Sequence, residues 1–312
     1  MKKNNVVCFG LTVADILARP VSLDFQKHDT TLVDEIAYAV GGDAFNEAHA
    51  LAHMGVPVKL ISNVGSDIWG DFIIKTGVEA GIDMEYVVRQ NKYPTTTSIV
   101  LIQQAGERNF ICNKESSAMN FEPEYLDIPS IENAKVLSLA SLYTCEEMDA
   151  AFLEAAKAAK KAGAIITADT IALNVRSLEC SAELFSLLDF IFPNYEEASI
   201  ITKETSLDGI AKVFLEYGVR NVVIKNGAYG CYIQNLNEKF DVPAYKNTRL
   251  IDTTGAGDNF AAGFIYGLFM DLPIRQCAAY ANAAAAVSIQ YLGAGGLKNL
   301  KEVEDMMAGG CQ

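Results

Sequence analysis

The chain has 312 residues, of which 50% are hydrophobic and 21% are charged, so it can bury a sizeable core in one large or two small domains. Its formal net charge of -14 argues against a nucleic-acid partner, because neutralising phosphates needs a face rich in lysine and arginine. No apolar run approaches the roughly 18 to 20 residues of a membrane span, and the MKKNN start lacks the apolar region of a signal peptide.

Seven cysteines are scattered along the sequence, and none are spaced as CxxC. Most of them have apolar neighbours, a pattern that favours buried free thiols. Free thiols are typical of a reducing compartment, so we expect a cytoplasmic protein with no membrane partner.

Apolar, β-branched runs alternate with helix-like segments along the chain. The predicted strands are 6–10, 58–65, 134–141, 163–169, 190–194 and 221–227, and the predicted helices are 43–55, 67–81, 146–163 and 207–218. Several of these helices stop at glycine, the residue that most favours a C-terminal cap. Short runs that are apolar on both faces, alternating with helices, indicate a mostly parallel sheet covered on both sides.

Two stretches, 15–40 and 95–113, break this pattern because they alternate as antiparallel strands do. The second reads as a hairpin with its turn near Ala105 and Gly106. We predict that both belong to a small sheet that projects from the α/β layer. Since there is no low-complexity linker and no repeat, residues 1–312 are predicted to form a single domain with these two insertions.

A glycine-rich stretch at 252–264, DTTGAGDNFAAGF, runs directly into a helix of small and apolar residues. The chain has no GxxxxGK[ST] loop, and a dinucleotide fingerprint would need glycine where Phe260 stands. The backbone N–H groups of Gly255, Ala256 and Gly257 at such a helix start can hold an anion.

Asp258 lies in the first turn of that helix, where a carboxylate would repel an anion. Its position is explained if it takes a proton from a hydroxyl while the neighbouring amides stabilise charge on a phosphoryl group. The alternative is that Asp258 only caps the helix. Two flanking glycines and Asp252 favour the catalytic interpretation.

The same stretch resembles the C-terminal signature of the ribokinase-like (PfkB-type) carbohydrate kinases. Similarities to this family recur in its order over the whole chain, at GLTVADIL (10–17), GGDAFNEAHALAHMG (41–55), NYEE (194–197), KNGAYG (225–230) and ANAAAA (281–286). The resemblance implies a ribokinase-like three-layer α/β sandwich with a mostly parallel central sheet and a small β-sheet lid. It also implies a kinase that transfers the γ-phosphoryl group of ATP, with Mg²⁺, to a hydroxyl of a monosaccharide or sugar acid.

The resemblance assigns further roles by position. It implies that Glu197 helps to organise hydrated magnesium, beside Asp258 as the general base and the Gly255–Gly257 amides as the anion hole. The implied sugar contacts are Asp15, Gly41, Gly42, Asp43 and Asn46, and the implied nucleotide contacts are Asn194, Lys225, Gly227, Gly230 and Asn282.

The family often has a monovalent-cation loop beside the anion hole. By resemblance, Asp252 and the Thr254 carbonyl would bind K⁺ there, and the carbonyls of residues 293–296 could supply the remaining ligands. The alternative is that Asp252 only accepts hydrogen bonds from backbone N–H groups of its own turn.

The acceptor stays open between sugar and sugar acid. Asp43 stands where ribokinase itself carries lysine, and its GGD sequence is similar to that of sugar-acid kinases acting on keto-deoxygluconate. A substrate carboxylate would need a cation, for which Arg108 and Arg176 are the candidates. Asp169, Asn174 and Arg176 are spread more widely than the compact DxNxR element of such kinases.

Other functions are weighed against the sugar kinase. A nucleoside kinase would need an aromatic slot, which Tyr38, Phe45 or Phe110 could build. A non-catalytic sugar sensor is disfavoured because Asp258 and Glu197 are both present, and a nicotinamide dehydrogenase because its glycine loop is absent.

The projecting sheet carries apolar residues at alternate positions, Ile99, Leu101, Phe110 and Cys112, which need a cover. In relatives the lids of two subunits often pair. We therefore expect a homodimer formed through the lid.

Overall fold

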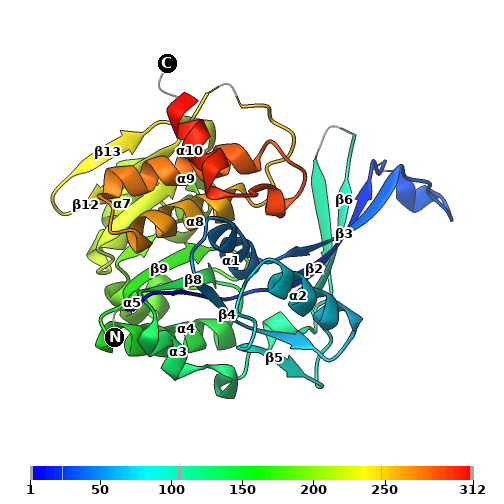
Figure 1. Ribbon diagram of the computed structural model, residues 1–312, viewed down its shortest axis with the longest axis horizontal. Helices are drawn as coiled ribbons and strands as arrows, with labels where there is room; N and C mark the ends of the chain where they lie inside the picture. Colours follow the sequence, from blue (N-terminus) through cyan, green and yellow to red (C-terminus); the bar gives the residue numbers. More distant parts are fainter. Residues whose placement is uncertain (1–2, 23, 105–106, 247, 310–312) are drawn as a thin grey trace.

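A computed structural model of the chain describes residues 3–22, 24–104, 107–246 and 248–309 (Figure 1). The strands are β1 Val6–Phe9, β2 Val13–Arg19, β3 Glu35–Gly41, β4 Val58–Gly65, β5 Val87–Gln90, β6 Thr97–Ile102, β7 Arg108–Cys112, β8 Val136–Leu142, β9 Ile165–Thr170, β10 Phe190–Ile191, β11 Asn221–Lys225, β12 Cys231–Asn235 and β13 Lys239–Val242. The helices are α1 Asp43–His53, α2 Ile68–Glu79, α3 Ile128–Asn133, α4 Glu146–Lys161, α5 Leu178–Leu187, α6 Tyr195–Thr202, α7 Leu207–Glu216, α8 Ala256–Phe269, α9 Ile274–Ser288 and α10 Leu300–Gly309.

The larger sheet has the strand order β13-β12-β11-β10-β9-β8-β1-β4-β5. Strand β1 pairs in parallel with β4 on one side and with β8 on the other, so the order of the chain reverses between β1 and β8. In open α/β sheets, ligands bind outside the carboxyl ends of the strands at such a reversal. The predicted parallel sheet is confirmed, with antiparallel β12 and β13 added at one edge.

Both faces of the sheet are buried, which explains why its strands are continuously apolar. All residues of β1 are 0% exposed; Val6 and Cys8 pack into the core that includes α1, α2 and α8–α10, and Val7 and Phe9 into the core that includes α3–α7. Figure 1 shows α8 and α9 on one side of the sheet and α3 and α4 on the other. The three-layer α/β architecture is therefore confirmed.

The smaller sheet, which we call the lid, has the order β3-β2-β6-β7 and projects from the main layer (Figure 1). Each hairpin is antiparallel, and the two are joined by parallel pairing of β2 with β6. The predicted turn at residues 105–106 lies outside the described residues.

The register of the lid divides its side chains between two faces. Asp15 pairs with Ser98 and Ser98 with Cys112, so Asp15 shares a face with Cys112 and, by alternation along β7, with Phe110 and Arg108. Ile99 pairs with Ile16 and Ile111 on the opposite face. The four apolar residues predicted to need one cover therefore lie on two different faces.

The six cysteines in the described ranges are free. Only Cys8, Cys231 and Cys277 are buried, whereas Cys112 and Cys180 are exposed, so the prediction that most thiols are buried was too broad. Among the described helices, none combines the length and apolar character needed to span a membrane.

Candidate active site

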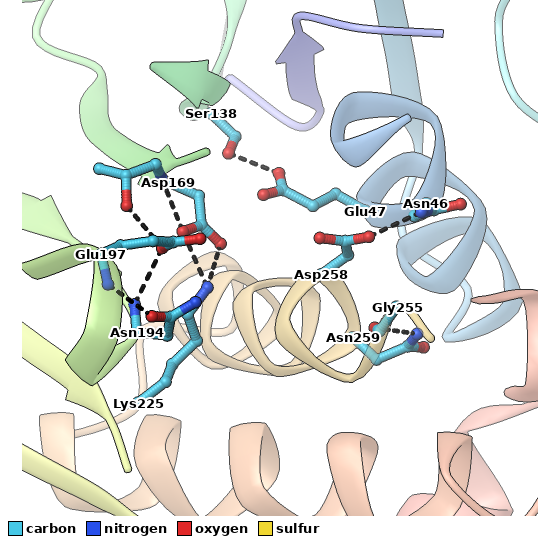
Figure 2. A network of polar contacts seen from close by, with 11 residues as sticks. Asn46, Glu47, Ser138, Asp169, Asn194, Glu197, Lys225, Gly255, Asp258 and Asn259 are labelled. Carbon is cyan, nitrogen blue, oxygen red and sulfur yellow. Dashed lines mark hydrogen bonds and ion pairs between the residues drawn. The ribbon is translucent and has the colours of Figure 1, made fainter. Parts of the chain in front are cut away.

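Two helix N-termini meet at the centre of the candidate site, one from α1 and one from α8 (Figure 2). The Asn46 side-chain amide, in the first turn of α1, donates a hydrogen bond of 2.6 Å to Oδ2 of Asp258, in the first turn of α8. This contact brings together two residues that the sequence assigned to the sugar and to the base.

The start of α8 is shaped by Gly255, which has φ +69°. A Cβ at this position would lie 2.4 Å from the Ala294 Cβ, so only glycine fits. The Ala256 N–H donates to the Thr253 carbonyl at 3.2 Å, while the hydrogen bonds of the described residues leave the N–H groups of Gly255 and Gly257 unpaired. Of the three predicted anion-hole amides, Ala256 is therefore already bonded.

Burial raises the pKa of the Asp258 carboxyl above its ordinary value, although the hydrogen bond from Asn46 and the charge of Lys225 oppose the shift. A carboxylate with a raised pKa is a stronger base than an exposed aspartate. Asp258 is half-buried rather than sealed, so a ligand can reach it.

A buried cation lies directly beside the anion-hole turn. The Lys225 ammonium, at the end of β11, donates to both carboxylate oxygens of Asp169 at 2.6 and 2.8 Å (Figure 2). A Cβ on Gly257 would lie 3.2 Å from this ammonium. Burial alone would lower the Lys225 pKa, but the carboxylates of Asp169 and Glu197 outweigh it and raise the pKa. A positive charge is thus kept next to the N–H groups that can hold a phosphoryl group.

Glu197 and Asn194 form a capping box at the start of α6. The Asn194 side chain accepts from the Glu197 N–H at 2.8 Å, and Glu197 Oε2 accepts from the Asn194 N–H at 3.1 Å and from Thr170 Oγ1 at 2.8 Å. The Asn194 side-chain oxygen therefore caps α6, which leaves its side-chain NH₂ group for a ligand.

The carboxylates near the anion-hole turn could not bind Mg²⁺ without further ligands. No group of three or more His, Cys, Asp or Glu in the described ranges could hold a metal ion by itself. Mg²⁺ commonly keeps several waters and binds through one or two carboxylates plus phosphate oxygens. Glu197, whose Oε1 accepts no hydrogen bond from the described residues, suits it together with a nucleotide, whereas both oxygens of Asp169 accept from Lys225.

Gly41 and Gly42, which precede α1, are each favoured as glycine for a different steric reason. A Cβ on Gly41 would lie 2.2 Å from Oδ2 of Asp15, and a Cβ on Gly42 (φ +90°) would lie 2.5 Å from the Leu11 carbonyl oxygen. Burial raises the pKa of the Asp15 carboxyl to about 7. Gly41 therefore leaves room for the Asp15 side chain, and Gly42 allows the turn itself.

A buried carboxyl that the sequence analysis missed, Glu47, follows Asn46 on α1. It is 0% exposed, its Oε2 accepts from Ser138 Oγ at 2.6 Å, and its Oε1 has no partner among the described residues. Figure 2 shows its carboxyl directed toward the same space as Asp258. Burial, with the nearby charges of Asp169 and Asp258, raises the pKa of the Glu47 carboxyl well above its ordinary value and so favours its protonated form.

We expect Glu47→Gln to flatten the pH dependence of the free energy of unfolding. A carboxyl with a raised folded-state pKa stabilises the fold fully below its unfolded pKa, and this contribution is lost as pH rises through the folded pKa. The variant should thus gain stability relative to the wild type as pH rises above the unfolded pKa of glutamate, about 4.3, measured by urea unfolding. The exposed Glu79→Gln should leave the pH dependence unchanged, and an unaltered slope in Glu47→Gln would contradict a raised Glu47 pKa.

Two of the predicted nucleotide residues, Asn282 and Gly230, pack against the segment that follows β13. The Asn282 side chain donates to the carbonyls of Val242 and Pro243 at 3.0 and 3.2 Å, and a Cβ on Gly230 would lie 2.1 Å from the Val242 carbonyl. Gly227, in contrast, has open space around it. The segment they position borders a cavity of about 670 Å³, lined among others by Pro243, Val287, Tyr291 and Met306.

Neither candidate cation for a substrate carboxylate is free. Arg108 of β7 pairs with Asp252, and Arg176 pairs with Asp149 and, at 3.5 Å, with Glu146. In this structure Arg108 contacts the glycine turn, and its contact with the substrate stays a prediction.

The aromatic slot proposed for a nucleoside is not assembled. Phe45 is 2% exposed in the core, and the Tyr38 ring contacts Trp69 in a tilted arrangement with ring centroids 5.6 Å apart. Tyr38 pairs with Ile16 and so lies on the opposite lid face from Phe110.

The predicted monovalent-cation site does not fit the residues present. Asp252 Oδ1 accepts from the Thr254 N–H at 2.9 Å, from Thr254 Oγ1 at 2.7 Å and from Arg108, and Oδ2 accepts from the Gly293 N–H at 2.8 Å. The Ala294 carbonyl accepts from Asn259 at 3.0 Å and the Gly295 carbonyl from the Lys298 ammonium at 2.8 Å. Of the oxygens expected to bind K⁺, those of Asp252, Ala294 and Gly295 thus already accept hydrogen bonds, two of them from protein cations, while the Thr254 carbonyl accepts none from the described residues.

A three-layer sandwich with a separate lid and a glycine turn leading into an acidic helix start defines a ribokinase-like phosphotransferase. A crystal structure of ribokinase from Thermotoga maritima has this fold, with a TM-score of 0.85 at 25% identity, over 98% of this chain and 99% of that one.

The chain belongs to the pfkB family of carbohydrate kinases, whose model matches residues 3–300. It is 29% identical over 302 residues to a ribokinase from Staphylococcus aureus, covering 93% of this chain and 95% of that protein. It is also 26% identical over 274 residues to a 2-dehydro-3-deoxygluconokinase from Bacillus subtilis, covering 83% of each. The protein is therefore a phosphotransferase with an alcohol group as acceptor.

Proposed function

We propose that the protein transfers the γ-phosphoryl group of ATP to a hydroxyl of a neutral monosaccharide. The observation that supports this proposal is the Asn46–Asp258 contact, because it joins the proposed sugar-binding residue to a carboxyl with a raised pKa at the start of α8. Relatives named as ribokinase and as 2-dehydro-3-deoxygluconokinase support a sugar-type acceptor.

A neutral acceptor follows from the charges around the site. Asp43, Glu47 and Asp258 influence one another's ionisation, and in the described part of the chain the cation that acts on them is Lys225, which is paired with Asp169. A substrate carboxylate would face these acids without a free cation. Carboxylates and the Asn46 amide instead suit sugar hydroxyls, which donate and accept hydrogen bonds.

In the proposed reaction, Asp258 removes the proton of the attacking hydroxyl as that oxygen bonds to the γ-phosphorus and the bond to the ADP oxygen breaks. The N–H groups of Gly255 and Gly257 and the Lys225 ammonium stabilise the charge on the transferring group. Mg²⁺, held with the nucleotide through Glu197 and water, supplies further neutralisation of phosphate charge when bound. The lid limits access of water, which would compete as acceptor.

An ADP-release screen tests this proposal. Neutral pentoses, hexoses and ketoses would be compared with sugar acids and nucleosides, at equal concentration with Mg-ATP. We expect turnover with a neutral sugar and none with the sugar acids. Preference for a sugar acid or a nucleoside would overturn the neutral acceptor, and silence across the panel with ATP still bound would favour the non-catalytic sensor.

Alanine at the two glycines should separate sugar binding from folding. Gly41→Ala is expected to push the flexible Asp15 side chain aside and raise KM for the sugar, with little change in the free energy of unfolding. Gly42→Ala meets the Leu11 backbone at positive φ and should cost about 1–3 kcal/mol of stability. Steady-state kinetics and urea unfolding of both variants measure this difference, and equal effects of the two on KM and stability would contradict it.

We also propose that two subunits pair through the lid face opposite Asp15. Ile36, Tyr38, Ile99 and Ile111 on that face are 59%, 60%, 40% and 53% exposed, which is unusual for large apolar side chains. Light scattering that finds a monomer at micromolar concentration would rule out this pairing.

A further inference from the structure

We propose that Arg108 of the lid takes the place of a monovalent cation at the glycine turn, so that the lid itself completes the anion hole and catalysis needs no potassium. This inference rests on the proposed kinase function. It concerns the turn formed by residues 252–257, which leads into α8 and the anion-hole amides.

Asp252 is the anchor of this turn. Its two carboxylate oxygens hold the Thr254 N–H, the Thr254 hydroxyl and the Gly293 N–H, and thereby join the segment before α8 to the segment after α9. Gly255, the first anion-hole residue, packs against Ala294 in that second segment. The position of the anion-hole amides therefore depends on the charge state of Asp252.

A buried carboxylate needs a compensating cation. The Asp252 side chain is 4% exposed and the Arg108 side chain 18% exposed, so this ion pair is shielded from solvent. Burial opposes ionisation of Asp252, but hydrogen bonds from Gly293 and Thr254, together with the charge of Arg108, hold its pKa below the ordinary value. Arg108 thus supplies the positive charge that a bound cation would otherwise supply.

The neighbouring carbonyls point to the same conclusion. A cation beside Asp252 would draw on the carbonyls that follow α9, yet the Ala294 carbonyl is bonded to Asn259 and the Gly295 carbonyl to the Lys298 ammonium. A K⁺ ion would have to share these carbonyls with Asn259 and Lys298 and come close to the guanidinium of Arg108. Like charges at such distances repel.

Because the Arg108 guanidinium belongs to the lid, a movement of the lid on substrate binding would also move the cation that pairs with Asp252. Arg108 and Asp15 lie on the same lid face, one beside the glycine turn and the other beside the sugar site at Gly41. A crevice of about 410 Å³ at this junction is lined by residues that include Arg19, Glu35, Arg108 and Asp252. A sugar that binds Asp15 and orders the lid should therefore also hold Arg108 against Asp252 and order the anion-hole amides.

The test compares turnover in potassium chloride and in choline chloride at equal ionic strength, for the wild type, Arg108→Ala, Arg108→Lys and Arg19→Ala. Arg19 is the matched control, because it is a lid arginine on the same crevice but pairs with Glu35. Amide exchange of residues 252–257 and 293, measured without substrate, provides a readout that does not depend on activity.

We expect wild-type turnover to be equal in both salts. Arg108→Ala should lower kcat by about 10- to 100-fold, the factor expected for the loss of one charged hydrogen bond. The backbone amides of residues 252–257 should exchange their hydrogens faster in this variant than in the wild type. Potassium should restore part of the loss in this variant only, Arg108→Lys should retain more activity than Arg108→Ala, and Arg19→Ala should behave as the wild type.

Dependence of the wild type on potassium, or wild-type exchange and turnover in Arg108→Ala, would overturn the inference. The absence of any phosphoryl transfer by the wild type would refute the proposed function instead. In that case the exchange data still decide whether Arg108 orders the glycine turn, since faster exchange at 252–257 supports it and unchanged exchange overturns it.

Discussion

Asp258→Asn is expected to lower kcat by about 10²- to 10⁴-fold, the range for a lost general base, while ATP binding stays close to that of the wild type. Asparagine keeps the size of the side chain and can still contact Asn46, but it cannot accept a proton from the sugar hydroxyl. Single-turnover kinetics with the sugar found by the screen, together with nucleotide titration, would measure both quantities.

The pH profile adds a signature that misfolding would not produce. Because burial raises the Asp258 pKa, wild-type kcat/KM should fall as pH decreases through that raised value, and the Asn variant should lack this limb. Asp71→Asn is the matched control, since Asp71 also lies in the first turn of a helix, α2, but is exposed and pairs with Arg89. Wild-type turnover in Asp258→Asn would refute its role as the base.

Lys225→Met is expected to lower both stability and turnover, for different reasons. Removing the ammonium leaves the Asp169 carboxylate buried without its partner, which typically costs about 3–5 kcal/mol. It also removes the positive charge beside Gly257, and loss of one group that stabilises a transition-state anion typically costs about 10²- to 10³-fold in kcat. Urea unfolding and steady-state kinetics would measure the two effects.

The double variant Asp169→Asn/Lys225→Met distinguishes these two roles. It removes both charges, so most of the lost stability should return, whereas turnover should stay low because the cation is still missing. Recovery of kcat along with stability would mean that Lys225 acts only as the structural partner of Asp169.

The central architecture could be predicted because its signals are local. The run at 6–9 is apolar at every position, and the structure places alternate residues of β1 in two cores. Strands β12 and β13 were not predicted. The edge strand β13 has no buried residue and so carries a weak signal, whereas β12 is buried at four of its five positions and alternates between the two cores, so its apolar run was overlooked. The projecting sheet was predicted from alternation, but its face assignment depends on register, which a one-residue shift reverses.

Site residues could be predicted where they belong to a local sequence motif. They could not be predicted where their role depends on a partner that is distant in the sequence. Asp258 and Asn46 were identified from their own motifs, and the structure brings them into contact. Arg108 was interpreted as a substrate contact because no local pattern indicates that its partner is Asp252. Glu47 could have been noticed as a charge within the apolar face of a helix, a pattern that often marks a functional group.

The lid is assembled from two hairpins that are distant in the chain, and this bears on the order of folding. Its central pairing, β2 with β6, joins residues 14–18 to residues 97–101, with α1, β4, α2 and β5 between them. Closing such a loop costs entropy that only prior formation of the intervening layer can reduce. We therefore expect the main sheet around β1 and β4 to form before the lid does.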